Sequence, residues 1–252
     1  MFEPTLPHDN AELMALSDFR RLQDEAARAR SVDAGTTRLT SLSATLLDDL
    51  RRFEPTGRDG DGLEALEVLA AAVRHGRSLR LHLQYRYRVI PVTVFPAEGT
   101  LHCTLNLPQL LGMELSDLCV LHVEPAWLRP PGSSDAARVG EARHYAPLAP
   151  FLWELALRGA RESLLPEIAS PAAYRVPPGT ALHLLGLTGS LGAAVDRLQR
   201  RFCNVSEIAS WPGFDRERAT RLLNALYLQA ALMVSRTHPA AINEDRPVGP
   251  AH

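Results

Sequence analysis

The spacing of hydrophobic residues changes near residue 79, and this change most narrows the folds open to the chain. Between Leu79 and Tyr87, leucine or tyrosine occupies every second position, and arginine, histidine or glutamine fills the positions between them. A period of two is typical of a strand whose two faces meet different environments. Residues 79–88 are therefore predicted to form one amphipathic strand or a tight hairpin.

Helix-like spacing precedes this strand, and further strand-like runs follow it. The helical segments are 10–30, 38–53 and 63–75, and the strand-like segments are 89–95, 100–106 and 118–124. Asn10 is a candidate N-cap, Gly76 suits the end of a helix, and a short helix is expected from Pro108. Strands joined by short connections predict an antiparallel sheet, so residues 1–128 are expected to form an α+β module.

The pattern changes again after residue 128. Residues 129–146 are rich in proline, glycine and serine and lack a period, which predicts a linker. Residues 147–238 are mainly helical in pattern, and residues 239–252 are expected to form a frayed tail. A chain of 252 residues is long enough for two modules that each bury a core. The predicted fold class is α+β, with N-terminal helices and a small antiparallel sheet followed by a mainly helical module.

Composition and charge exclude several classes of protein. All 27 basic residues are arginine, so a P-loop, a pyridoxal phosphate site or a kinase site that depends on lysine is absent in its usual form. The net charge of -2 gives no overall attraction to nucleic acid or anionic membranes, and no apolar run approaches the ~20 residues of a membrane span. The three cysteines are widely spaced, and the first residues lack the pattern of a signal peptide. These features predict a cytoplasmic protein without a membrane partner.

The predicted strand carries the first candidate site. Arg80, His82, Arg86 and Arg88 fall on one face if the strand is continuous, and no acid occurs between residues 68 and 97. Arginine forks suit phosphate or carboxylate groups, so this face is a candidate for binding an anion or an acidic partner. The alternative is a solvated sheet face. The histidines at 82, 102 and 122 lie on three predicted strands without the spacing of a metal-binding motif, and neither a metal nor a cofactor is predicted.

A second pattern, at residues 182–200, resembles the glycine-rich turn of short-chain dehydrogenases. Gly186, Gly189 and Gly192 lie between a strand-like run and a helix-like run, where such glycines let a pyrophosphate approach a helix N-terminus. About sixty residues follow, without the strands that a parallel sheet needs. We therefore interpret the glycines as a tight turn.

The C-terminal module carries several signals for helix starts. Ser190 is a candidate cap for a helix that reaches Phe202, Asn204 and Glu207 have the spacing of a capping box, and Asp215 is a candidate cap for a long helix. A short strand is expected at 233–238. The run NVSEIASWPGFDRERATRLLNALYLQAALMVS resembles a winged-helix type of helix-turn-helix over about sixty residues.

This resemblance implies DNA binding as one function. The start of the last helix would enter the major groove and present Arg216, Arg218, Thr220 and Arg221. Asp215 and Glu217 lie at the same end of that helix, where phosphates would repel them. Winged helices also serve as protein-binding modules, so both functions stay open.

The predicted function is that of a non-catalytic, cytoplasmic regulatory or adaptor protein that contacts another protein. A DNA-binding transcriptional regulator is the alternative, and self-association stays open. No motif of a known enzyme class is found, so the chain is not expected to be an enzyme, and an enzyme with a nonstandard site is the third possibility after these two. The order of a small α+β module and a helical module loosely resembles bacterial signalling adaptors of the PatA type, a resemblance of organisation alone.

Overall fold

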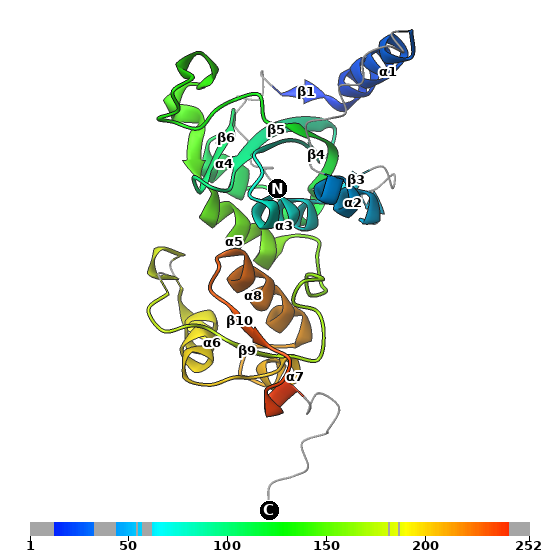
Figure 1. The fold of residues 1–252 in the computed structure, drawn as a ribbon. Coiled ribbons are helices and arrows are strands. Elements are labelled where there is room, and N and C mark those ends of the chain that lie inside the picture. The colour runs from blue at the N-terminus through cyan, green and yellow to red at the C-terminus, as the bar shows by residue number, and fades with distance from the viewer. Residues whose placement is uncertain are drawn as a thin grey trace, which may run out of the picture. The chain divides into compact units, whose positions relative to one another are not determined.

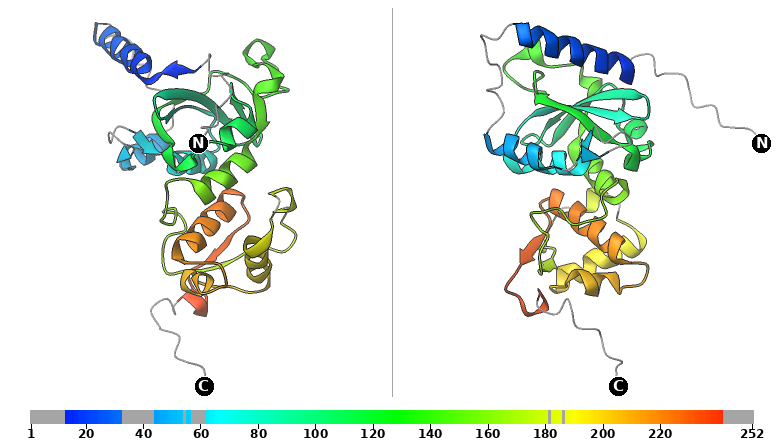
Figure 2. Two further views of the ribbon diagram at one scale, coloured as in Figure 1. Left: turned by 180° about the vertical axis from the view of Figure 1, so that it is seen from behind. Right: turned by 90° about the vertical axis from the view of Figure 1, so that its right-hand side faces the viewer.

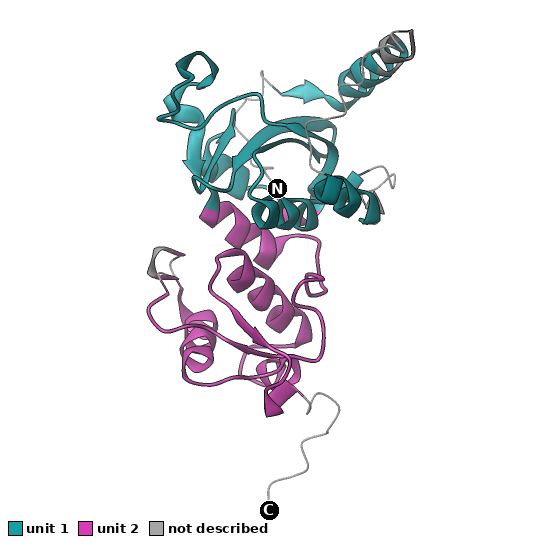
Figure 3. Cartoon of the chain, in the orientation of Figure 1, with its two compact units in different colours: residues 1–113, 117–148 teal, residues 114–116, 149–252 magenta. Residues whose placement is uncertain are grey.

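A computed structural model describes residues 13–32, 44–53, 55–56, 62–180, 182–185 and 187–241. It confirms the predicted α+β class. The chain divides into two compact units, one of residues 1–113 and 117–148 and the other of residues 114–116 and 149–252 (Figure 3). No helix among the described residues is long and apolar enough to cross a membrane. The predicted cap Asn10, Gly186 and most of the predicted tail lie outside the described residues.

The described part of the first unit is built on an antiparallel sheet of eight strands (Figure 1). The strands are β1 (Met14–Ala15), β2 (Pro55–Thr56), β3 (Gly62–Glu64), β4 (Leu79–Tyr85), β5 (Arg88–Phe95), β6 (Thr100–Cys103), β7 (Cys119–Pro125) and β8 (Tyr145–Pro147). Their order is β2-β3-β7-β4-β5-β6-β8, and β1 pairs with the start of β5. Each of the strands predicted at 89–95, 100–106 and 118–124 is present with somewhat different ends.

Helices cover both faces of this sheet. They are α1 (Leu16–Val32), α2 (Ala44–Arg52), α3 (Ala65–His75) and α4 (Leu107–Leu111). The right view of Figure 2 places α1 on one side of the sheet and α2 with α3 on the other. The Glu64 carboxylate caps α3 by accepting from two backbone N–H groups, and α3 ends, as predicted, at Gly76 with a left-handed φ of 57°.

The alternation of residues in β4 sets the two faces of the sheet. Leu79, Leu81 and Leu83 are completely buried and form the core face together with the buried leucines of α3. Arg80, His82 and Gln84 point to the opposite face, where they are partly exposed. Of the two alternatives predicted for residues 79–88, one continuous strand or a tight hairpin, the structure has the hairpin, because Arg86 and Tyr87 form the turn between β4 and β5. Arg86 and Arg88 therefore do not continue the row of Arg80 and His82.

The segment predicted as a linker belongs to the first unit. It contains two short 3-10 helices, Ala136–Arg138 and Ala142–His144, and its last residues begin β8. The Arg129 N–H donates to the Arg138 carbonyl over 2.8 Å, and the Tyr145 hydroxyl donates to the Arg129 carbonyl. These bonds fold the segment back on itself. They explain why a composition typical of a linker is found here in an ordered loop.

The second unit is mainly helical, with a small antiparallel pair of strands. Its elements are α5 (Leu148–Arg158), β9 (Ala173–Arg175), a 3-10 helix (Leu182–Leu185), α6 (Gly189–Arg200), α7 (Val205–Ala209), α8 (Arg216–Leu228) and β10 (Met233–Ser235). A further 3-10 helix spans Leu115–Asp117. The strand expected at 233–238 is present as β10, paired with β9. α7 and α8 begin after the predicted caps Asn204 and Asp215.

One buried amide ties a loop of the second unit to its central helix. Asn224 of α8 is completely buried. Its Oδ1 accepts from the Leu165 N–H over 2.9 Å, and its Nδ2 donates to the Ser163 carbonyl over 3.0 Å. A buried amide in such a place is tolerated because its hydrogen bonds are made within the protein.

Candidate interaction surfaces

The face of the sheet under α1 holds two of the predicted site residues. Arg80 lies opposite Glu124 of β7, and the Arg80 Nε lies 3.5 Å from a Glu124 carboxylate oxygen. His82 lies opposite His122 and packs against Phe19 of α1, with 4.9 Å between the ring centroids. Arg80 thus forms an ion pair with a carboxylate of the same chain that lies 44 residues away in sequence.

His82 is a neutral group at neutral pH. Its side chain is 12% exposed, and its Nδ1 is buried without a hydrogen-bond partner among the described residues. Burial first, and then the nearby Arg80 and His122, together lower the pKa of His82 to about 4. Arg80 and His82 therefore do not form the cationic pair that an anion site requires. This differs from the interpretation of the strand as one continuous basic face.

The other two histidines predicted on strands, His102 and His122, do not belong to a metal-binding cluster of described residues. His102 lies edge-on to His144 and Tyr145, and burial first, then His144 and Arg80, lowers its pKa. Throughout the described residues, no group of three or more histidine, cysteine, aspartate or glutamate side chains is placed to hold a metal ion.

The tip of the β4–β5 hairpin is an exposed cluster of aromatic and basic side chains. Tyr87 is 78% exposed, and the Arg86 guanidinium lies 5.2 Å from the centre of the Tyr85 ring. Arg86 has a φ of 54°, in the left-handed region that arginine seldom adopts. The backbone of the turn is fixed on both sides. The Gln84 amide donates to the Arg86 carbonyl, and the Leu16 N–H donates to the Tyr87 carbonyl.

Two further arginines between residues 68 and 97, Arg74 and Arg88, have structural partners. The Arg88 guanidinium donates to the Leu13 carbonyl over 2.9 Å and helps to hold β1 against β5. Arg74 and His75 both contact the Asp49 carboxylate of α2, and the hydrogen bonds from His75 and Arg74 lower the pKa of Asp49. In the described part of the chain, Arg86 makes no ion pair with an acid, and its charge faces solvent.

The second unit contains a groove that the sequence patterns did not indicate. It lies between α6 and the turn from α7 to α8, and it has a volume of about 250 Å³. Its lining consists of Gly189, Ser190, Ala193, Ala194, Arg197, Trp211, Pro212 and Phe214. In the sequence, the groove is marked only by Trp211 and Phe214, the aromatic residues on either side of Pro212 and Gly213. Neither residue belongs to a periodic pattern.

The residues expected to contact DNA are largely engaged within the second unit. Thr220 is 4% exposed. Arg221 pairs with Glu217 and donates to the Leu157 carbonyl, each over 2.9 Å. Arg218 donates to the Gly213 carbonyl and to the Ser190 hydroxyl. The fourth residue, Arg216, is exposed, so the structure does not bring these four side chains to one open surface.

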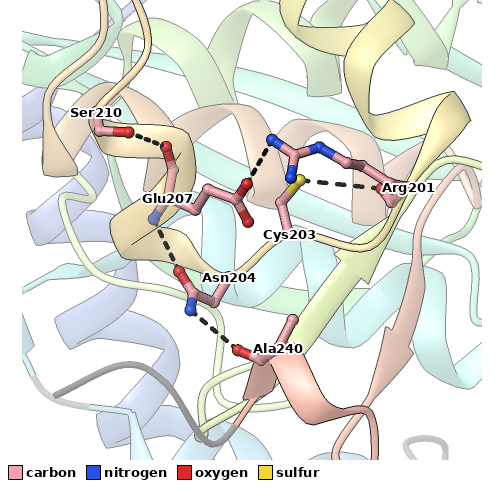
Figure 4. Close-up of polar contacts among 6 residues, drawn as sticks. All are labelled: Arg201, Cys203, Asn204, Glu207, Ser210 and Ala240. Atoms are coloured by element: carbon pink, nitrogen blue, oxygen red, sulfur yellow. Dashed lines mark hydrogen bonds and ion pairs between the residues drawn. The ribbon is translucent and has the colours of Figure 1, made fainter. Parts of the chain in front are cut away.

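A polar network fixes the start of α7 (Figure 4). The Asn204 Oδ1 accepts from the Glu207 N–H over 2.7 Å, as expected for an N-cap, while the Asn204 Nδ2 donates to the Ala240 carbonyl over 2.9 Å. The Glu207 carboxylate pairs with Arg201 in place of the second half of a capping box. Asn204 thus caps a helix and also ties the chain near residue 240 to it.

The glycine-rich turn serves the start of α6. Gly189 has a φ of 58°, which glycine adopts without strain, and it is the first residue of the helix. Thr188, not Ser190, occupies the N-cap position, and its side chain makes no capping hydrogen bond. The strands described in this unit are one antiparallel pair, so the surroundings of a dinucleotide-binding turn are not found here.

Comparisons with protein-family models, with curated proteins and with solved structures give no match to this chain.

Proposed function

We propose that this protein is a non-catalytic regulatory or adaptor protein that acts by binding another protein through the tip of the β4–β5 hairpin. The observation that carries the proposal is the exposure of Tyr87 beside Arg86 on a turn whose backbone is held in place. Tyrosine and arginine are enriched among the residues that dominate protein interfaces. A held backbone also lowers the entropy lost on binding.

Burial of this tip in an interface would contribute enough free energy to affect the binding affinity. A tyrosine side chain buries roughly 150 Å² in an interface, which corresponds to at most about 4 kcal/mol at roughly 25 cal/mol per Å². The left-handed conformation of Arg86 costs on the order of 1 kcal/mol relative to glycine. An arginine at a strained backbone position favours a role for its side chain outside the fold.

We place this function in the cytoplasm. All three cysteines are free and buried, and free thiols are usual in reducing compartments.

The test compares partners captured by the wild-type protein and by hairpin variants. We expect one or more proteins from the native host to bind the wild type and to be lost with Tyr87→Ala and with Arg86→Gly. Arg86→Gly removes the side chain and relieves the backbone strain, so its free energy of unfolding should stay within about 1 kcal/mol of the wild type. Leu22→Ala is the matched control, because Leu22 is an exposed apolar residue on α1.

Capture of the same proteins by the wild type and both hairpin variants would refute the proposal. Loss of the same proteins with Leu22→Ala as well would also count against it, since the effect would then not be specific to the hairpin.

A further inference from the structure

The groove of the second unit has two walls. One wall is α6, where Gly189, Ala193 and Ala194 leave room because their side chains are small or absent. The other wall is the turn at 211–214, in which the rings of Trp211 and Phe214 lie edge to face with 6.3 Å between centroids. Arg218 joins the two walls by donating to the Gly213 carbonyl over 2.7 Å and to the Ser190 hydroxyl over 2.9 Å. The Arg197 guanidinium of α6 also lies over the Trp211 ring.

The size of the groove suits one large side chain. Its volume of about 250 Å³ lies below the range of roughly 300–1,000 Å³ that is usual for cofactors and drug-sized ligands. Trp211 is 7% exposed, and the Arg197 guanidinium lies 5.3 Å from the centre of the Trp211 ring. A nucleobase needs an open aromatic face for stacking, so this geometry favours the side chain of a peptide over a nucleic acid.

The charges around the groove favour an acidic occupant. Residues 182–238 contain seven arginines and four acids. Three of these acids are engaged within the unit: Glu207 pairs with Arg201, Glu217 pairs with Arg221, and Asp215 caps α8. The fourth acid, Asp196, is exposed on α6.

Arg197 is the basic residue placed to receive a carboxylate. It lines the groove, it is exposed, and within the described residues it makes no ion pair. The guanidinium of Arg218, by contrast, already spends donors on Gly213 and Ser190. A carboxylate beside the groove would form a charge-assisted hydrogen bond with Arg197, which remains stacked on Trp211.

We propose that this groove binds a segment of a partner protein in which one large apolar side chain is flanked by carboxylates. The apolar side chain enters between Ala193 and the rings of Trp211 and Phe214, and a neighbouring carboxylate pairs with Arg197. This surface goes beyond the hairpin tip and rests on different residues. A partner that binds through both surfaces would gain affinity from the second contact without any change in the first.

The experiment selects peptides from a random library displayed on phage, with the full-length protein as bait. We expect the enriched sequences to share a large apolar residue next to aspartate or glutamate. A synthetic peptide of the enriched sequence is then titrated against variants of the full chain. Arg197→Ala should weaken binding about tenfold, and Ala193→Leu, which fills the groove from an exposed position, should abolish it.

Arg200→Ala is the matched control. It removes the same charge from an exposed position on the same helix, but Arg200 does not line the groove, so the affinity should change less than twofold. Tyr87→Ala should bind the peptide as the wild type does, so failure of the hairpin proposal and failure of this one can be told apart. Thermal unfolding of each variant shows whether a loss of binding reflects a loss of folded protein.

Three results would overturn the proposal. The first is an enriched set of peptides without acidic residues. The second is undiminished binding to Ala193→Leu. The third is binding of single-stranded oligothymidine, lost with Arg197→Ala, in place of peptide binding, which would make the groove a nucleic-acid site.

Discussion

Acid should destabilise the first unit through His82. The pKa of this buried side chain is about 4 in the folded protein, against an ordinary value near 6.5. Between these values the unfolded chain binds a proton that the folded protein does not bind. The contribution of His82 to stability is therefore complete above pH 6.5 and is lost as the pH falls toward 4.

The size of this effect follows from the difference in pKa. A difference of about 2.5 pH units corresponds to at most roughly 3 kcal/mol, and residual solvent access will make it smaller. The groups that face His82 are Arg80, His122, Glu124 and the ring of Phe19. The first two oppose protonation, and Glu124, 3.9 Å from the His82 Nε2, favours it. His102, whose pKa is also lowered, adds to the effect in the same direction.

The assay is urea unfolding at pH 7.5, 6.5, 5.5 and 4.5 for the wild type and for His82→Leu. Leucine fills a similar space against Phe19, removes the unbonded Nδ1 and cannot titrate. We expect the variant to be as stable as the wild type at pH 7.5 and to lose less stability at pH 4.5, by as much as about 2.5 kcal/mol. Phe19→Ala exposes His82 to solvent, so the stability of this variant should also depend less on pH than that of the wild type. Parallel pH dependences for the wild type and His82→Leu would refute the view that His82 is buried and neutral.

Two further outcomes are expected. Asn224→Ala should lower the free energy of unfolding by about 2–4 kcal/mol, because it leaves the Leu165 N–H and the Ser163 carbonyl without partners; a loss below 1 kcal/mol in urea unfolding would contradict this. The alternative function predicts that DNA binding depends on Arg216. We expect instead that Arg216→Ala does not weaken the binding of duplex DNA at low salt, because Thr220 is buried and Arg221 is engaged within the protein. A weaker, salt-dependent affinity in Arg216→Ala at unchanged melting temperature would establish α8 as a DNA-binding helix.

Local signals in the sequence predicted the elements that depend on local chemistry. The alternation from Leu79 to Tyr85 identified β4 and its buried face, Gly76 identified the end of α3, and Asp215 identified the start of α8. Each of these rests on a backbone conformation or a period that nearby residues determine.

The short strands escaped prediction because long-range pairing creates them. β1, β2 and β3 have two or three residues each, and β3 lies at the start of what was predicted to be a helix. β1 pairs with β5 and β3 pairs with β7, both distant in sequence, and β2 is held only by its pairing with β3, so no short window reveals them. The same holds for the candidate sites. Only the pairing of β4 with β7 shows that Glu124 neutralises Arg80, and only the fold brings the turn at 211–214 to α6.

Each unit contains a buried cysteine whose rate of chemical modification depends on the opening of that unit. Cys103 in the first unit and Cys203 in the second are completely buried, and burial raises their pKa values to about 11 and about 12. A thiol reagent at pH 8 therefore finds almost no thiolate in either place until the surrounding structure opens. With Cys119 replaced by serine, the rate of modification at each remaining thiol measures the opening free energy of its own unit. The two thiols thus report the opening of the two units separately. When a substitution is made in one unit, the modification rate of the thiol in the other unit serves as an internal standard.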